Sequence, residues 1–196
     1  MKKSYFLILL VFLTGCSEIP SRPEMVSDIE QQNQREQIKR WKLNGRLSLI
    51  SKKENGTVTF HWAQDDDRYL MRFIAPLGQG TYALRGGEGN GVYLHTAKNK
   101  VLHADDAKSL LRQYVGWYIP MSGFRYWVRG LPEPGVEVTD QQFDKQGRIS
   151  EMQQAGWSIS IKRYMDVAGV GLPSKIFMQN DHFKLKLIIQ AWDTKL

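Results

Sequence analysis

The sequence predicts a mainly β fold with a few helices, of the α+β class. Three observations lead to this prediction. Apolar and polar residues alternate in many short segments, turn-forming residues separate these segments, and two short stretches with helical periodicity interrupt them. Because most of the connections are short, we expect the roughly ten strands to run antiparallel. The 181 residues left after the first fifteen (196 minus 15) suffice for one domain with a sizeable core and hardly for two.

The strands are recognised by their period of two. In the segment WKLNGRLSL, the apolar residues Trp41, Leu43, Leu47 and Leu49 alternate with polar ones. A strand with this pattern buries one face and exposes the other. The same alternation predicts further strands at residues 57–62, 68–74, 81–85, 91–95, 157–162 and 183–190.

Turn-forming residues join the first strands into hairpins. Asn55-Gly56 has the residues of a type I′ turn, and Asp65-Asp66-Asp67 forms a second turn signal. A loose glycine-containing turn lies between the strands at 81–85 and 91–95. These turns predict that strands consecutive in the chain are also neighbours in the sheet.

A first helix is predicted before the strands. The sequence Ser27-Asp28-Ile29-Glu30 has the pattern of a capping box. The helix is expected to begin there and to run to about Arg40. Its apolar stripe is thin, so it needs a neighbour on which to pack.

Two further short helices are predicted in the middle of the chain. Residues 107–115 carry apolar side chains at helical spacing, with Asp105 or Asp106 as the N-cap and Gly116 as the stop. Between Ser122 and Pro132, apolar residues recur at positions i, i+3, i+4 and i+7. Two explanations fit these large apolar faces: the helices fill a core, or they close the mouth of a curved sheet with an apolar concave face.

The N-terminus has the features of an export signal. Two lysines precede an apolar run from Tyr5 to Leu13, which is too short to span a bilayer, and small residues follow. The segment Leu13-Thr14-Gly15-Cys16 resembles a bacterial lipobox, which implies that Cys16 becomes the acylated first residue of the mature protein. The alternative is an ordinary secretory signal that a cysteine happens to follow.

The predicted organisation is a lipoprotein signal peptide over 1–15, an acylated N-terminus and tether over 16–26, and a single domain over 27–196. Cys16 is the only cysteine, so its acylation leaves no disulfide and no thiol nucleophile. The only cofactor-like group expected is this covalent lipid. Ser17 follows the cysteine, and by the general pattern of bacterial lipoproteins it indicates the outer membrane, with the domain facing the periplasm.

The chain is basic. Its net charge is +7, or +5 once Lys2 and Lys3 leave with the signal peptide. A basic body beside anionic lipid is physically reasonable, because each such cation contributes about 1 kcal/mol near the surface. A simple solvated surface explains the charge equally well. Export argues against nucleic acid as the partner.

We find no pattern that supports catalysis or metal binding, so we expect a protein that is not an enzyme. The four histidines are scattered and lack the spacing of metal ligands. Neither a G-x-S-x-G elbow nor a P-loop occurs. The GGEGNG stretch lies between two predicted strands and lacks the following helix that a phosphate site needs.

The segment FIAPLGQG poses a different question. A predicted strand ends at Pro76, and Leu77 follows at once before Gly78. Pro and Gly mark a turn, and turns lie on the surface. Leu77 either folds back to anchor the turn or extends toward something outside the protein.

Several segments together resemble the LolB family of outer-membrane lipoproteins, which receive other lipoproteins from a periplasmic carrier. They run in order along nearly all of the mature chain: WKLNGRLSL, FHW followed by RYLMRFIAPLG, GWYIP, WVRGLP, DKQGRI, QAGW, LPSKI and IQAW. The resemblance implies an incomplete, strongly curved antiparallel β-barrel with a helical lid over a hydrophobic cavity for acyl chains. It also implies that Leu77, between Pro76 and Gly78, protrudes from a membrane-delivery loop.

The resemblance implies partners and a set of lining residues. The partners are a LolA-like periplasmic carrier, cargo lipoproteins and the lipid of the outer membrane, with the protein acting as a monomer. The candidate lining of the cavity or lid comprises Phe60, Trp62, Phe73, Leu110, Leu111, Tyr114, Phe124, Trp127, Trp157 and Ile159. Three alternatives stay open: a lipocalin-like lipoprotein that binds another amphiphile, an envelope enzyme with an unrecognised site, and a structural lipoprotein with a filled core.

Overall fold

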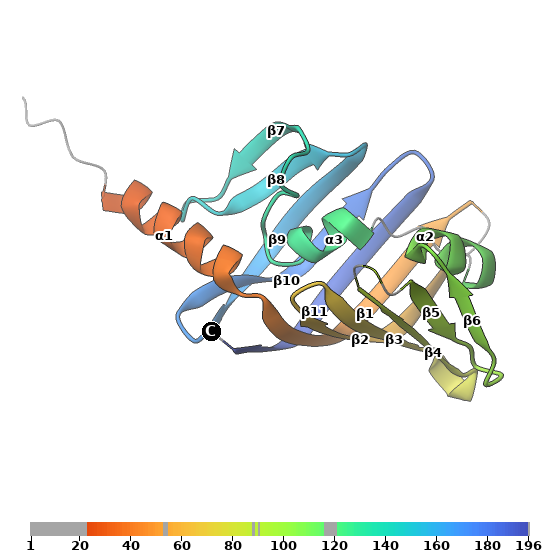
Figure 1. Ribbon diagram of the computed structural model, residues 1–196. Helices are drawn as coiled ribbons and strands as arrows, with labels where there is room; N and C mark the ends of the chain where they lie inside the picture. The colour runs from red at the N-terminus through yellow and green to blue at the C-terminus, as the bar shows by residue number, and fades with distance from the viewer. Residues whose placement is uncertain (1–22, 53–54, 88, 90, 116–120, 196) are drawn as a thin grey trace, which may run out of the picture.

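A single sheet of eleven strands organises the computed structural model, which describes residues 23–52, 55–87, 89, 91–115 and 121–195. The strand order is β6-β5-β4-β3-β2-β1-β11-β10-β9-β8-β7, and every recorded pair is antiparallel. The sheet is not closed, and the three α-helices α1, α2 and α3 lie beside it (Figure 1). The predicted fold class is confirmed: a mainly antiparallel, incomplete barrel with helices.

The helices and strands have the following bounds. The helical elements are α1 (Pro23–Gln37), η1 (Pro76–Gly78), α2 (Ala107–Leu110), η2 (Leu111–Val115, wound as a π-helix) and α3 (Met121–Trp127). The strands are β1 (Arg40–Ser51), β2 (Asn55–Asp65), β3 (Arg68–Ile74), β4 (Thr81–Gly86), β5 (Val92–His95), β6 (Val101–Ala104), β7 (Val138–Phe143), β8 (Ile149–Gln154), β9 (Trp157–Val167), β10 (Val170–Gln179) and β11 (Phe183–Lys195).

The chain forms two meanders that meet in the middle of the sheet. The first runs from β1 outward to the edge strand β6, and the second runs from the other edge strand β7 inward to β11, which pairs with β1. Neighbouring strands lie about 4.8 Å apart, so the connection between the two edges must cross the sheet. That connection contains α2, η2 and α3. Topology alone therefore places these helices over one face (Figure 1).

Alternation along β1 explains why the sheet has one apolar face. Its buried positions alternate with exposed ones along almost the whole strand, as the sequence predicts. Gly45 lies at the bulge where the β1–β11 register shifts, and a Cβ there would collide with the carbonyl oxygen of Ile188. Glycine is required at this position because only it permits such a close approach of two backbones.

The first helix differs from the prediction at both ends. It begins at Pro23 rather than Ser27, and it ends at Gln37 rather than near Arg40. Proline is favoured in the first turn of a helix because its missing N–H needs no partner there. The helix therefore extends into the segment that was expected to be tether.

The predicted turn at Asn55-Gly56 is wrong. Both residues belong to β2, where Asn55 faces Ile50 and Gly56 faces Leu49. A two-residue turn at Asn55-Gly56 would pair Asp65 with Arg46 and leave the start of β1 without this neighbour. The observed register pairs Asp65 with Arg40, so that all of β1 up to Ile50 is bonded to β2.

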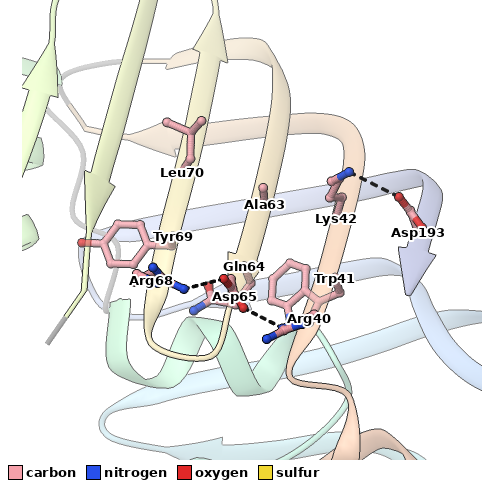
Figure 2. Close-up of a pocket in the computed structure, with 10 residues that line it drawn as sticks. All are labelled: Arg40, Trp41, Lys42, Ala63, Gln64, Asp65, Arg68, Tyr69, Leu70 and Asp193. Atoms are coloured by element: carbon pink, nitrogen blue, oxygen red, sulfur yellow. Dashed lines mark hydrogen bonds and ion pairs between the residues drawn. The ribbon is translucent and has the colours of Figure 1, made fainter. Parts of the chain in front are cut away.

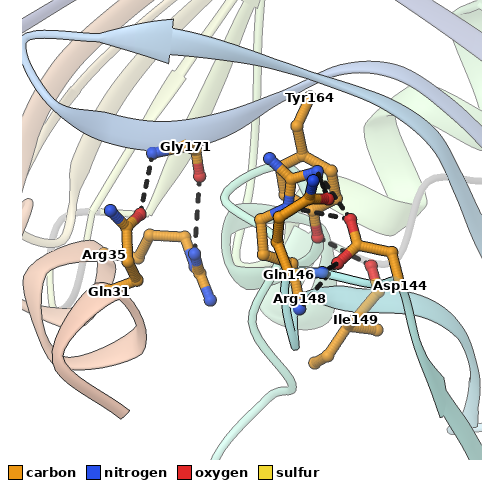
Figure 3. Close-up of polar contacts among 8 residues, drawn as sticks. All are labelled: Gln31, Arg35, Asp144, Gln146, Arg148, Ile149, Tyr164 and Gly171. Atoms are coloured by element: carbon orange, nitrogen blue, oxygen red, sulfur yellow. Dashed lines mark hydrogen bonds and ion pairs between the residues drawn. The ribbon is translucent and has the colours of Figure 1, made fainter. Parts of the chain in front are cut away.

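Polar contacts attach α1 to the β9–β10 hairpin of the second meander. Gln31 accepts a hydrogen bond from the Gly171 amide of β10 at 3.0 Å, and Arg35 donates to the Gly171 carbonyl at 3.5 Å (Figure 3). Close by, Arg148 donates to the Asp144 carboxylate at 2.6 and 2.8 Å and lies over the ring of Tyr164. Burial raises the pKa of Tyr164. None of the described helices is long and apolar enough to cross a membrane.

Candidate functional site

An aromatic wall lies on the concave face of the first meander. Phe60 and Trp62 on β2 and Phe73 on β3 are almost completely buried, and Phe60 faces Phe73 across the strand pair with their ring centroids 5.2 Å apart. On the second meander, Trp157 and Ile159 of β9 are buried as well. The period of two in each strand places all five on the inner face.

The α3 helix contacts both meanders. Phe124 lies 5.0 Å from Trp62 and 6.4 Å from Phe60 between ring centroids. Trp127 lies 6.2 Å from Trp157 on the other side. The helix therefore bridges the two halves of the concave face, and it covers the wall as a lid.

The α2 segment contributes a smaller part of the lid. Leu110 and Leu111 are buried, as is Ala107 in the first turn. Asp106 caps this helix: its carboxylate accepts hydrogen bonds from the Ser109 hydroxyl at 2.7 Å and the Ser109 amide at 2.9 Å. These bonds, the one from the hydroxyl foremost, hold the pKa of Asp106 below its ordinary value. Of the two predicted caps, Asp106 is the one that acts.

Tyr114 does not join the other candidate lining residues. Its side chain is 42% exposed, whereas the other nine are buried. The chain from Leu111 to Val115 is wound as a π-helix, which has more residues per turn than an α-helix. The spacing of 3.6 residues that put Tyr114 on the apolar face of the predicted helix therefore does not apply here.

The lid's own side chains occupy the concave face. Two hollows flank α3, of about 250 and 260 Å³, and they share Gln64, Asp67 and Arg125 in their linings. The second hollow is lined by Trp62 of the aromatic wall together with Ala107 of α2 and Met121 of α3, so side chains of the wall and of the lid share it. The vacant interior expected from the sequence stays a prediction.

A few polar contacts hold the lid in place. Arg125 of α3 forms an ion pair of 2.7 Å with Asp67, in the turn between β2 and β3, and both side chains are partly exposed. Arg129 donates to the carbonyl of Ile38 at 2.7 Å and to that of Arg35 at 3.2 Å. Burial lowers the pKa of Arg129 to about 10, which leaves it charged at neutral pH.

A buried glutamine anchors the chain after the lid. Gln154 of β8 accepts hydrogen bonds from the Trp127 indole at 2.7 Å and from the Glu133 amide at 2.8 Å. Its amide donates to the carbonyls of Glu133 and Val136. Sequence reasoning missed Gln154, Arg125 and Arg129. The one sequence signal for the two arginines was their spacing: Arg125 and Arg129 are four residues apart and so lie on one face of a predicted helix.

The loop from Ala75 to Gly80 presents Leu77 to solvent. Its side chain is 97% exposed, the most of any large apolar residue in the described chain. The loop is closed by hydrogen bonds from the Ala75 amide to the Gly80 carbonyl, 3.0 Å, and from the Gln79 amide to the Pro76 carbonyl, 3.2 Å. Leu77 is therefore held outward by an ordered turn and does not fold back onto the sheet.

Backbone conformation sets the shape of this loop. Leu77 has a φ of +55°, which is uncommon for a leucine, and Gly80 has a φ of +117°. A Cβ on Gly80 would collide with the Cβ of Ala97. The glycine thus lets the loop pass close to the neighbouring turn.

Two other predictions concern the acylated cysteine and metal binding. Cys16 lies outside the described residues. In the part of the chain that is described, no three His, Asp or Glu side chains are grouped as a metal site.

Comparison with known proteins decides the family. A family model described as outer membrane lipoprotein LolB matches residues 39–192. The chain belongs to the LolB family. An outer-membrane lipoprotein LolB from Nitrosococcus oceani is 35% identical over 193 residues, covering 96% of both chains. Another from Cellvibrio japonicus is 36% identical over 165 residues, covering 82% of this chain and 81% of the relative.

Solved structures with very different sequences share the fold. A LolA superfamily protein from Nitrosomonas europaea superposes with a TM-score of 0.53 at 6% identity, covering 87% of this chain and 94% of the other. A DUF1329 family protein from Desulfovibrio piger has a TM-score of 0.52 at 8% identity, covering 88% and 92%. At such identities these likenesses show the fold alone.

Proposed function

We propose that this protein, anchored in the outer membrane through acylated Cys16, accepts lipoproteins from a periplasmic carrier, shelters their acyl chains and inserts them into the membrane. Membership of the LolB family supports this role. The single structural observation that carries it is the ordered loop that holds Leu77 outward, with the side chain 97% exposed. This loop belongs to the same domain as the apolar wall that the lid covers.

The wall and lid supply the shelter. Because the wall is covered in the closed form, acyl chains reach it only when α3 moves aside. Transfer into that space is favourable by roughly 0.8 kcal/mol for each CH₂ group removed from water. Phe60, Trp62, Phe73, Trp157 and Ile159 would line the opened space from the sheet, and Phe124, Trp127, Leu110 and Leu111 would line it from the lid.

The proposed transfer needs no catalysis and no nucleotide. Its direction requires only that the acyl chains bind here more favourably than on the carrier, and 1.4 kcal/mol gives about a tenfold preference. The hydrocarbon of the bilayer is then a still more favourable environment for the acyl chains than the protein is. Leu77 provides about 1.5–3 kcal/mol of membrane contact when buried, which is small enough to be reversible.

The test replaces Leu77 with glutamate. A carboxylate at the loop tip opposes insertion into hydrocarbon, so Leu77→Glu is expected to fold and to accept cargo from the carrier but to fail in delivering it to vesicles. Phe143→Glu is the matched control, because Phe143 is another exposed apolar residue and lies on the edge strand β7. Normal delivery by Leu77→Glu in the reconstituted assay would refute the role of the loop.

A second variant separates the anchor from uptake. Cys16→Ala behind a cleavable signal peptide is expected to give a soluble protein that still takes up cargo, since Cys16 precedes every described helix and strand. If this folded protein accepted a free amphiphile but no acylated lipoprotein, a lipocalin-like role would replace the one proposed.

A further inference from the structure

The convex face of the sheet is divided into two halves of different charge. On β1, β2, β3 and β11, the side chains that alternate with the buried ones point away from the lid. We call the half near the β2–β3 turn the turn-side surface and the half near the Leu77 loop the tip-side surface. The turn-side surface comprises Arg40, Lys42, Ala63, Asp65, Arg68, Leu70 and Asp193. The tip-side surface comprises Asn44, Arg46, Ser48, Ile50, Thr57, Thr59, His61, Arg72, Ile74, Lys184, Lys186 and Ile188.

Every cation of the turn-side surface has a carboxylate partner. Asp65 accepts from Arg40 at 2.9 Å and from Arg68 at 2.8 Å. Lys42 lies 3.6 Å from Asp193 (Figure 2). These pairs border a hollow of about 540 Å³. Their charges are largely compensated within the protein.

The tip-side surface carries four exposed cations and no carboxylate. They are Arg46, Arg72, Lys184 and Lys186, and none of them is in an ion pair among the described residues. The ammonium group of Lys186 lies 6.0 Å from the centre of the Phe177 ring. The nearest acid along β11 is Asp181, which precedes the strand. The positive charge here is uncompensated over an area that crosses four strands.

The strand register brings these cations together with apolar side chains. Arg46 faces Thr59, which in turn faces Ile74. Ile50 faces Lys184 across the β1–β11 pair. Ile50 is 53% exposed and Ile74 is 36% exposed. Paired strands lie about 4.8 Å apart, so Lys184 lies beside Ile50, and Arg46 lies two strand spacings, about 10 Å, from Ile74.

This surface is continuous with the delivery loop. Ile74 is the last residue of β3, and the loop that holds Leu77 follows it directly. A bilayer surface presents anionic headgroups above hydrocarbon, so it matches cations beside exposed apolar side chains. A carboxylate-free basic surface next to a fully exposed leucine therefore has the chemistry of a membrane contact.

We propose that the tip-side surface binds anionic phospholipid headgroups and thereby orients the Leu77 loop toward the bilayer. The inference rests on the proposed function, because it concerns the delivery of cargo to the membrane. The tip-side surface adds a preference for particular lipids, which Leu77 alone does not provide. Each cation near an anionic surface strengthens binding roughly fivefold. The preference is for acidic lipids over zwitterionic ones, and salt weakens it.

The experiment measures vesicle binding without the acyl anchor. The mature chain with Cys16→Ala is sedimented with vesicles of phosphatidylcholine alone or with phosphatidylglycerol added, at low and high salt. In this background the triple variant Arg46→Gln, Arg72→Gln, Lys184→Gln is compared with Arg40→Gln, Lys42→Gln, Arg68→Gln. Both sets remove three positive charges from the same face, so they are matched in net charge.

The tip-side variant is expected to lose about a hundredfold in binding to phosphatidylglycerol vesicles, whereas the turn-side variant loses severalfold at most. Equal losses in the two variants would show that only net charge matters and would overturn the proposal. So would equal binding of the Cys16→Ala parent to both kinds of vesicle.

Cargo uptake from the carrier in solution separates this inference from the proposed function. The tip-side variant is expected to accept cargo normally. If it lost uptake while keeping its vesicle binding, the surface would be a docking site for the carrier and the lipid proposal would fall. If the Cys16→Ala parent accepted no cargo yet bound acidic vesicles, the proposed function would fail while the membrane contact stood.

Discussion

The aromatic wall and the Leu77 loop are both apolar, and they differ in every other respect. Phe60 in the wall is completely buried, whereas Leu77 is 97% exposed. Phe60 packs against Phe73 of β3 and Phe124 of α3, while Leu77 lies in a short turn closed by its own backbone hydrogen bonds. The comparison separates two kinds of apolar residue: buried ones such as Phe60, which stabilise the fold, and exposed ones such as Leu77, which do not.

The difference also bears on how the two regions act together. The wall is covered by side chains of α3, and a small number of polar contacts keep that helix seated. The loop needs no such cover, because it is ordered without it. In the proposed function, opening of the lid and contact of Leu77 with the membrane therefore do not depend on each other.

Truncation of the two residues should give the largest contrast. Phe60→Ala is expected to lower the free energy of unfolding by about 3–5 kcal/mol, because it leaves a cavity among aromatic neighbours. Leu77→Ala is expected to change it by less than about 0.5 kcal/mol. Urea denaturation followed by tryptophan fluorescence measures both. A comparable loss in Leu77→Ala would mean that the leucine packs on the domain in solution.

The shape of the loop should depend on Gly80 more than on Gly78. Gly80→Ala introduces a Cβ at a φ of +117° that would collide with Ala97, so a loss of about 1–2 kcal/mol and weaker delivery are expected. Gly78→Ala is the control, since its φ is also positive but nothing lies within 4 Å of the added Cβ. Urea denaturation and the delivery assay measure the two effects. Equal effects on delivery would remove the close approach to Ala97 as the feature that positions the loop.

The ion pair between Arg125 and Asp67 should affect the lid more than the fold. Asp67→Asn is expected to cost below about 1 kcal/mol in unfolding, because the pair is partly exposed and solvent screens it. It should nevertheless increase binding of a hydrophobic dye to the wall. Arg40→Gln is the control, because it breaks a similar pair with Asp65 that does not hold the lid. The same rise in dye binding in both variants would contradict the role of Arg125 as a lid contact.

The smallest expected effect is the response of α2 to acid. The pKa of Asp106 is lowered in the fold, so the carboxylate stabilises the cap above its ordinary pKa. That contribution is lost as the pH falls through the lowered value. Hydrogen exchange of the Ser109 amide should then rise relative to other amides. Asp106→Asn, whose amide oxygen still accepts a hydrogen bond, should remove this pH dependence, and its persistence would point to another group.

The strand pattern could be predicted because it is local. Alternation in β1, β2, β3, β9 and β11 indicated which side chains share a face, and the structure confirms the inward orientation of Phe60, Trp62 and Ile159. The turn at Asn55-Gly56 failed because an even shift of register keeps the same residues on the same face. Only the pairing of the whole of β1 with β2 decides between the two registers.

The sequence by itself determined the fold class, the inner and outer faces of the named strands and the place of Leu77 at a turn, because each depends on residues that are close in the chain. Tertiary structure alone decided that the lid is seated on the wall, that Tyr114 lies outside, and that Arg46, Ile74 and Lys184 share one surface. These features depend on the β1–β11 pairing and on contacts of α3 with both meanders, between residues far apart in sequence. No local periodicity carries such information, since many packings satisfy the same pattern.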